Sequence, residues 1–178
     1  VALPEQVSMD SAGNVYFTDT ANHRVRKVSR STGIISTVAG SGNIGFAGDG
    51  GPAIAASMTF PAGIAIDSAG NLFISDTGNS RVRRVDAVTG IISTIAGSRI
   101  GFFGDDGPAT LAGINAPRGL AFDASGNLYI ADSTNHRIRR ISRSGTITTF
   151  AGNGAADFSG DGGPASAAAL NSPRAIAF

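Results

Sequence analysis

The sequence repeats one pattern three times, and this repeat limits the possible folds more than any other feature. The middle copy reads Asp-Ser-Ala-Gly-Asn-Leu-Phe-Ile-Ser-Asp-Thr-Gly-Asn-Ser-Arg-Val-Arg-Arg-Val. The copies span residues 10–28, 67–85 and 123–141. Landmark prolines recur at intervals of 56 or 57 residues, namely Pro4, Pro61, Pro117 and Pro173. A fixed period of this size indicates a repeat architecture, in which each unit packs on its neighbours.

Each unit is expected to contain four short strands joined by tight turns. The 25 glycines, the 7 prolines and the low charged fraction of 15% favour short strands over long helices. In the middle unit we expect strands at residues 63–67, 72–75, 81–85 and 91–96. The fourth strand carries isoleucine on both faces, because Ile91 and Ile92 point to opposite sides. A sheet that is apolar on both faces needs a neighbour on each side, which predicts propeller blades rather than a sandwich.

A glycine-rich connection follows the fourth strand of each unit and ends in a proline followed by alanine. We call residues 45–58, 101–114 and 157–170 the capping loops. Each proline is expected at the first position of a helix of one or two turns, where its missing N–H costs nothing. These prolines are Pro52, Pro108 and Pro164.

Residues 126–139 read Gly-Asn-Leu-Tyr-Ile-Ala-Asp-x-x-Asn-His-Arg-Ile-Arg, which resembles the NHL repeat. The resemblance covers essentially the whole chain. It implies an all-β propeller of four-stranded antiparallel blades, commonly six in number. The Gly-Asp-Gly-Gly-Pro-Ala loops are similar to longer NHL repeats of bacterial surface and secreted proteins, which favours such a location. The family includes protein-binding platforms, RNA-binding domains and a few lyases.

The chain is therefore expected to hold three blades and the start of another. Blade 1 spans about 3–59, blade 2 about 60–115 and blade 3 about 116–171, and residues 172–178 form the first strand of a further blade. Three blades do not close a ring, and uncovered blade edges favour association. Either two chains form a six-bladed homodimer, or a longer chain supplies the other blades. Open-ended arrays are a third possibility.

An aspartate and an arginine recur five residues apart in every unit. We predict that they form structural ion pairs between neighbouring strands. The alternative is a basic surface that binds phosphates. Each of these arginines begins a triplet of basic residues, and the other two residues of the triplet would form an exposed flank that binds anions. The predicted pairs are Asp19–Arg24, Asp76–Arg81 and Asp132–Arg137.

The sequence predicts no cofactor, no metal site and no catalytic residue. It has no cysteine, and calcium needs six to eight oxygens where each capping loop offers one or two carboxylates. His23 and His136 are expected to lie too far apart to share a zinc ion. A propeller lyase or hydrolase with a bound metal is the alternative. The capping-loop aspartates are expected to bind amides at the start of the short helix, and they are Asp49, Asp105 and Asp161.

Positions that differ between the units are the candidates for ligand binding. The residue after each landmark proline begins the innermost strand, near one mouth of the central channel. The capping loops also differ. Their aromatic and arginine residues could contact a partner, because such residues dominate interface energetics. We favour the other arrangement, in which the phenylalanines pack beneath the loop against the short helix. The candidates are Glu5, Ala62, Arg118 and Arg174 at the mouth and Phe46, Arg99, Phe102, Phe103 and Phe158 in the loops.

These observations predict a non-catalytic interaction or scaffold module that binds a protein or another ligand through its loops and channel mouth. The net charge of +1 provides no bulk attraction to nucleic acid or to an anionic membrane. No apolar run is long enough to span a bilayer. Nucleic-acid binding through the arginine and lysine triplets is the rival. It is disfavoured because the chain has no tryptophan and only two tyrosines for base stacking.

Overall fold

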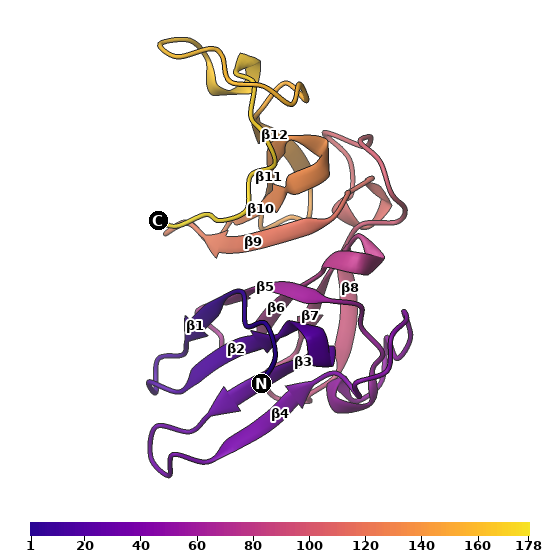
Figure 1. The fold of residues 1–178 in the computed structure, drawn as a ribbon, viewed down its shortest axis with the longest axis vertical. Coiled ribbons are helices and arrows are strands. Elements are labelled where there is room, and N and C mark those ends of the chain that lie inside the picture. The colour runs from indigo at the N-terminus through magenta and orange to yellow at the C-terminus, as the bar shows by residue number, and fades with distance from the viewer.

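The computed structural model describes residues 1–178 and contains three four-stranded antiparallel sheets, each built from four consecutive strands (Figure 1). The predicted all-β fold is confirmed. Blade 1 consists of β1 (Val7–Met9), β2 (Val15–Asp19), β3 (Arg24–Val28) and β4 (Ile35–Ala39). Blade 2 consists of β5 (Pro61–Ile66), β6 (Leu72–Asp76), β7 (Arg81–Val85) and β8 (Ile92–Ala96). Blade 3 consists of β9 (Pro117–Phe122), β10 (Leu128–Asp132), β11 (Arg137–Ile141) and β12 (Ile147–Ala151).

All helical segments are single turns of 3-10 helix. Three connect the second and third strands of the blades: η1 (Thr20–Asn22), η3 (Thr77–Asn79) and η5 (Ser133–Asn135). The other three lie in the capping loops: η2 (Ala53–Ala55), η4 (Ala109–Leu111) and η6 (Ala165–Ala167). None of them is long or apolar enough to cross a membrane.

The predicted position of the capping-loop prolines was wrong. Pro52 has extended backbone angles, φ −60° and ψ 128°, and precedes the helical turn instead of starting it. The turn ends after three residues, where Ala56 returns to extended backbone angles, φ −70° and ψ 143°. The Gly40 amide donates to Ala53 O at 2.9 Å and the Ser41 amide to Ala56 O at 2.8 Å, which ties the loop to the end of β4.

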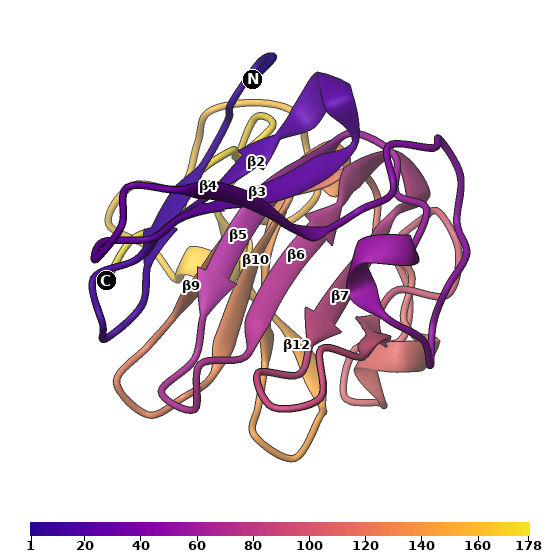
Figure 2. The same ribbon diagram turned by 90° about the horizontal axis from the view of Figure 1, so that it is seen from below.

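The hydrophobic core lies between the blades, as the two-sided apolar pattern predicts. One cluster joins blades 1 and 2 and includes Val25, Met58 and Ile74. A second joins blades 2 and 3 and includes Ile114 and Ile130. Both faces of blade 2 are therefore buried, and Figure 2 shows its sheet between the other two.

Glycine allows the innermost strands to come close together. A Cβ on Gly63 of β5 would lie 1.8 Å from the Arg118 carbonyl oxygen of β9. A Cβ on Gly119 would lie 2.7 Å from Arg174 O. At these two sites the neighbouring backbone occupies the space that a side chain would need.

Residues 172–178 run beside β9 in extended form but belong to no sheet. The Gly119 amide donates to Arg174 O at 2.9 Å, and the Phe178 ring lies 4.7 Å from that of Tyr129. The expected first strand of a further blade is thus an extended segment on blade 3. It forms no ladder because it has no second strand of its own to pair with.

Candidate functional site

The predicted aspartate–arginine ion pairs use a different arginine. Asp76 and Arg81 do lie opposite each other in the β6–β7 ladder. However, the Asp76 carboxylate faces Arg83, two residues further along, with Oδ2 and Nη1 3.6 Å apart. The same shift gives Asp19–Arg26 at 3.4 Å and Asp132–Arg139 at 3.3 Å. The expected pairs to Arg24, Arg81 and Arg137 do not form.

Backbone carbonyls bind the first arginine of each triplet instead. Arg81 donates from Nη1 to Asn79 O at 2.8 Å and from Nη2 to Ser98 O at 3.1 Å. Arg24 and Arg137 bind the equivalent carbonyls of their own blades. These carbonyls lie at loop ends, where no strand supplies a donor, so the guanidinium turns toward them and away from the aspartate.

The second arginine of the triplet links two blades. Arg83 of blade 2 is completely buried and binds Asp49 from the capping loop of blade 1, with Nη2–Oδ1 2.6 Å and Nε–Oδ1 3.1 Å. Asp49 Oδ2 also accepts a 2.6 Å hydrogen bond from Thr94 Oγ1. The Phe46 ring stacks on the blade 2 arginines, with its centroid 4.0 Å from Arg81 Cζ.

The same contact recurs between blades 2 and 3. Arg139 Nη2 lies 2.5 Å from Asp105 Oδ1, and Asp105 Oδ2 accepts from Thr149 Oγ1 at 2.6 Å. The Phe102 ring lies 3.6 Å from Arg137 Cζ. We call this set, a phenylalanine and an aspartate from one blade with two arginines and a threonine from the next, the interblade clamp.

The clamp corrects three expectations. Asp49 and Asp105 bind arginine and threonine of the next blade, and neither capping helix has a side-chain cap. Phe46 and Phe102 stack on arginine rather than packing against the short helix. The arginines expected on an exposed flank include Arg83, which has no exposed surface. In each case the partner comes from the neighbouring blade, which local spacing does not reveal.

The pKa values of the three equivalent aspartates, Asp19, Asp76 and Asp132, are not all shifted in the same direction. Burial raises the pKa of Asp76 and Asp132, although hydrogen bonds and the nearby arginines act to lower it. For Asp19, burial also acts to raise the pKa. The hydrogen bonds from the Ala2 amide and from Asn22, together with the nearby Arg26, outweigh the effect of burial and lower the Asp19 pKa.

Where the sequence predicts the channel mouth, the structure brings together two of the four residues that follow the landmark prolines. Glu5 Oε2 of blade 1 lies 2.5 Å from Arg118 Nη1 of blade 3, so this ion pair reaches past the equivalent position of blade 2. That position is Ala62, which is buried and presents no functional group. Arg174 is exposed on the extended tail. The mouth therefore carries a partly exposed ion pair made of residues that do not repeat.

Gln6 completes this region, and sequence reasoning missed it. Its Oε1 accepts from Ile64 N at 2.9 Å, and its Nε2 donates to Leu120 O at 3.2 Å. One side chain thus joins the innermost strands of all three blades. The available signal was that the other two copies have glycine here, Gly63 and Gly119.

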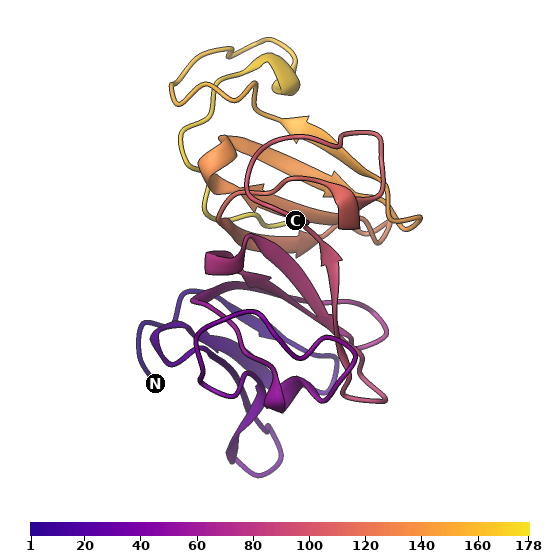
Figure 3. The ribbon, with the colours of Figure 1, turned by 90° about the vertical axis from the view of Figure 1, so that its right-hand side faces the viewer.

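The remaining loop candidates do not gather at one place. Arg99, just before the capping loop of blade 2, lies over the ring of Phe103 in that loop, 5.1 Å from its centroid. Phe158 is 80% exposed. Figure 3 shows its loop projecting away from blade 3. The loop candidates therefore form no common surface with the channel mouth.

The two histidines bind backbone. His23 Nδ1 accepts from Phe60 N and His136 Nδ1 accepts from Ser172 N, both at 3.1 Å. In blade 2 the equivalent acceptor is Ser80 Oγ, 3.4 Å from Ala116 N. No group of three or more His, Asp or Glu residues is placed to hold a metal ion.

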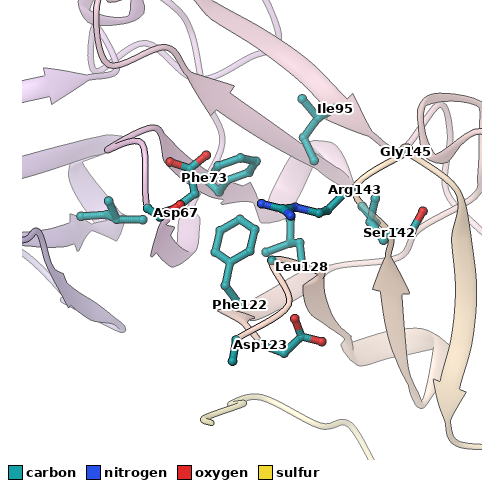
Figure 4. Close-up of a pocket in the computed structure, with 14 residues that line it drawn as sticks. Asp67, Phe73, Ile95, Phe122, Asp123, Leu128, Ser142, Arg143 and Gly145 are labelled. Carbon is teal, nitrogen blue, oxygen red and sulfur yellow. The ribbon is translucent and has the colours of Figure 1, made fainter.

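A pocket of about 560 Å³ opens between blades 2 and 3, at the opposite end of the innermost strands from Glu5 and Arg118. Its floor includes the rings of Phe73 and Phe122, which meet edge to face at 4.9 Å. Arg143 reaches over this floor from the β11–β12 turn (Figure 4). Its guanidinium makes no hydrogen bond or ion pair within the chain. The pocket thus combines an apolar floor with the Arg143 guanidinium and with two carboxylates, those of Asp67 and Asp123.

The blades, their repeats and the clamps define an NHL-type β-propeller segment. The family model described as "Teneurin NHL domain" matches residues 43–103 and 101–157. The chain belongs to this family.

Known proteins agree with this assignment. Human Teneurin-4 is 38% identical over 102 residues, covering 50% of this chain and 4% of that protein. A solved Bacteroides thetaiotaomicron protein of unknown function matches 97% of this chain and 41% of its own, with 22% identity and a TM-score of 0.73. A streptogramin B lyase matches 83% and 40%, with 14% identity and a TM-score of 0.58. The structural matches show the fold alone, and the chain spans under a tenth of the first curated relatives it matches.

Proposed function

We propose that this chain is a non-catalytic propeller module that binds a protein partner at the channel mouth. The observation that carries the proposal is the Glu5–Arg118 ion pair, with side chains 38% and 28% exposed. The repeated arginines, such as Arg83 and Arg139, are buried and already paired with aspartates. Charged residues that break the repeat and reach solvent are suited to specify a partner.

The site offers a charged contact to an extended peptide. Arg118 and Glu5 present opposite charges side by side, so a peptide with a complementary charged pair can replace their mutual contact. The amide of the neighbouring Gln6 already binds the innermost strands of blades 2 and 3, so Gln6 positions the backbone beside the ion pair.

A phage-displayed library of random peptides, selected against the whole chain, tests this proposal. Selected peptides are expected to bind Arg118→Ala about tenfold more weakly, as for a central interface residue. Arg140→Ala, which changes the same charge on β11, is the matched control and is expected to bind normally. Peptides that bind both variants as tightly as the unchanged chain would contradict a site at the mouth.

Nucleic-acid binding has less support, because two of the nine triplet residues, Arg83 and Arg139, are fully buried. A salt titration of binding to a labelled RNA pool distinguishes the two functions. We expect no association at low salt, where phosphate contacts are strongest. Tight binding that weakens steeply with salt would favour the RNA function.

The pocket beside Arg143 supports a second candidate function, which is binding of a small, largely apolar ligand. The pocket volume is in the range of ligand pockets, and its aromatic floor lies beside the Arg143 guanidinium and the Asp67 and Asp123 carboxylates. The probe is 8-anilinonaphthalene-1-sulfonate, and Arg143→Ala is expected to weaken its binding about tenfold, as loss of a charged contact does. Arg30→Ala, at the equivalent turn of blade 1, is the control. Equal binding by both variants would argue against this pocket.

A further inference from the structure

The pocket between blades 2 and 3 lies at a junction that the chain contains completely, because all of its lining residues belong to these two blades. Two residues at this junction differ from their equivalents at the junction of blades 1 and 2. Tyr16 stands there in place of Phe73, and Ala87 stands there in place of Arg143. Residues that break a repeat are not needed to build it, so they indicate where a ligand can be specified.

Phe73 leaves one carboxylate oxygen with fewer hydrogen bonds than in the other blades. In blade 1 the Tyr16 hydroxyl donates to Asp10 Oδ2 at 3.1 Å, and blade 3 has the equivalent hydrogen bond at 3.3 Å. In blade 2 Phe73 has no hydroxyl, so Asp67 Oδ2 accepts only from Asn71 Nδ2, at 2.8 Å. Figure 4 shows the Asp67 carboxylate pointing toward the Phe73 ring. A ligand hydroxyl can therefore make the bond that a tyrosine makes elsewhere.

The second available polar group is the Arg143 guanidinium. The β11–β12 turn that carries it, residues 142–146, is one residue shorter than the β7–β8 turn, residues 86–91. In the longer turn the Ala87 amide donates to Asn71 Oδ1 at 3.0 Å, and the shorter turn makes no such bond. Arg143 reaches over the pocket floor with its donors unused (Figure 4). A guanidinium with free donors is suited to bind a carboxylate through two parallel hydrogen bonds.

The other carboxylate of the pocket is already occupied. Asp123 Oδ1 accepts from Asn127 N at 2.9 Å. Asp123 Oδ2 accepts from Asn127 Nδ2 at 2.8 Å and from the Tyr129 hydroxyl at 3.3 Å. The free hydrogen-bonding groups of the pocket are thus an acceptor on Asp67 and the donors of Arg143.

An aromatic surface lies between these two groups. The Phe73 and Phe122 rings meet edge to face at 4.9 Å, and Phe122 replaces the smaller Ile66 of blade 2. Aromatic rings stack favourably on such a surface. The chemistry of the pocket therefore fits a flat apolar body with a hydroxyl at one end and an anion at the other.

We propose that this pocket binds a small aromatic carboxylic acid with a hydroxyl on its ring. The ring lies on Phe73 and Phe122, the hydroxyl donates to Asp67 Oδ2, and the carboxylate accepts from Arg143. The inference rests on the second candidate function, ligand binding in this pocket, and adds the chemical class of the ligand.

Isothermal titration calorimetry of the whole chain with three matched compounds tests the class. The compound 3-(4-hydroxyphenyl)propionate carries both polar groups, 3-phenylpropionate lacks the hydroxyl, and 4-ethylphenol lacks the carboxylate. We expect the first to bind about tenfold more tightly than either of the others, as a hydrogen bond to a charged group provides. Equal affinities, or no binding of the first compound, would overturn the proposal.

Two variants assign each preference to its residue. Phe73→Tyr supplies the hydroxyl from the chain, as Tyr16 does, and should fold normally. It is expected to bind 3-(4-hydroxyphenyl)propionate no more tightly than 3-phenylpropionate. Arg143→Ala is expected to remove the preference over 4-ethylphenol. Tyr16→Phe, the reverse change at the junction of blades 1 and 2, is the matched control and should keep both preferences. Preferences that survive in Phe73→Tyr and Arg143→Ala would contradict binding in this pocket.

Binding of 8-anilinonaphthalene-1-sulfonate separates this inference from the function on which it rests. If Arg143→Ala weakens binding of the dye while the three compounds bind equally, the pocket binds ligands and the proposed class is wrong. If Arg143→Ala leaves binding of the dye unchanged and none of the compounds binds, both the function and the class are wrong.

Discussion

Blade 2 is covered on both sides, whereas blades 1 and 3 each have one uncovered side. Equivalent residues therefore have different environments: Arg83 in blade 2 is fully buried and binds Asp49, while Arg26 in blade 1 lacks that carboxylate. The folding free energy of a repeat protein is approximately the sum of the contributions of its units and of the interfaces between neighbouring units. Here the strongest polar contacts of the repeat belong to the interfaces, so a single blade does not contain them.

The largest expected effect comes from the buried arginine. Arg83→Ala leaves Asp76 as an unpaired buried charge and should lower the free energy of unfolding by about 3–5 kcal/mol. Arg26→Ala removes a partly exposed arginine and should cost about 1 kcal/mol. Urea unfolding of both variants, at concentrations where the chain is monomeric, measures the difference. Equal losses would mean that the clamp adds nothing to the contacts inside a blade.

The next largest loss of stability is expected where the backbones of two blades pack closely together. Gly63→Ala places a methyl group against the Arg118 carbonyl and should cost about 1–3 kcal/mol through overpacking. Gly51→Ala, in a capping loop with its nearest atom at 3.4 Å, is the matched control. It should change stability by less than about 0.5 kcal/mol. Thermal unfolding of the pair tests whether the innermost strands are as close as described.

Aromatic stacking on the arginines should have a smaller effect. Phe102→Ala removes a ring that lies over Arg137 and should cost about 1–2 kcal/mol. Phe158→Ala removes the equivalent exposed ring and should cost less than about 0.5 kcal/mol in the monomer. The same denaturant experiment measures both. A similar cost for the two variants would show that the next blade is not what stabilises these rings.

The smallest effect is a difference in pH dependence. The Asp19 pKa is lowered, so the stability that ionised Asp19 contributes should be lost as pH falls below its ordinary value of 3.8. The Asp76 pKa is raised, so its contribution should be present at low pH and lost as pH rises above 3.8. The advantage of the unchanged chain over Asp19→Asn should therefore shrink on acidification, and its advantage over Asp76→Asn should grow. Unfolding free energies measured from pH 3 to 6 check the two signs.

Much of the fold could be predicted from the spacing of a few residues. The landmark prolines located the start of two innermost strands, since β5 begins at Pro61 and β9 at Pro117, whereas β1 begins at Val7, after Pro4. The pairing of Asp76 opposite Arg81 in the ladder also followed from their separation around a short turn. These features are local, and local backbone preferences determine them.

The candidate site was less predictable. Glu5 and Arg118 were selected because they break the repeat, but their direct contact across two blades was not foreseen. Gln6 was missed although both equivalents are glycine. Asp49 was assigned to its own helix and in fact binds Arg83, which lies 34 residues away. A residue that contacts its own blade and one that contacts the next blade repeat with the same period, so the period cannot distinguish them.

By itself, the sequence determined the number of blades, the order of their strands and the two apolar faces of each sheet. Only the tertiary structure decided which arginine binds which aspartate, because a long arginine side chain can reach acceptors in its own blade and in the neighbouring blade. It also showed that Phe158 and Arg26 are more exposed than their equivalents at the junctions between blades. Burial depends on whether a neighbouring blade is present, and identical residues therefore have different energies at the middle and at the ends of the chain.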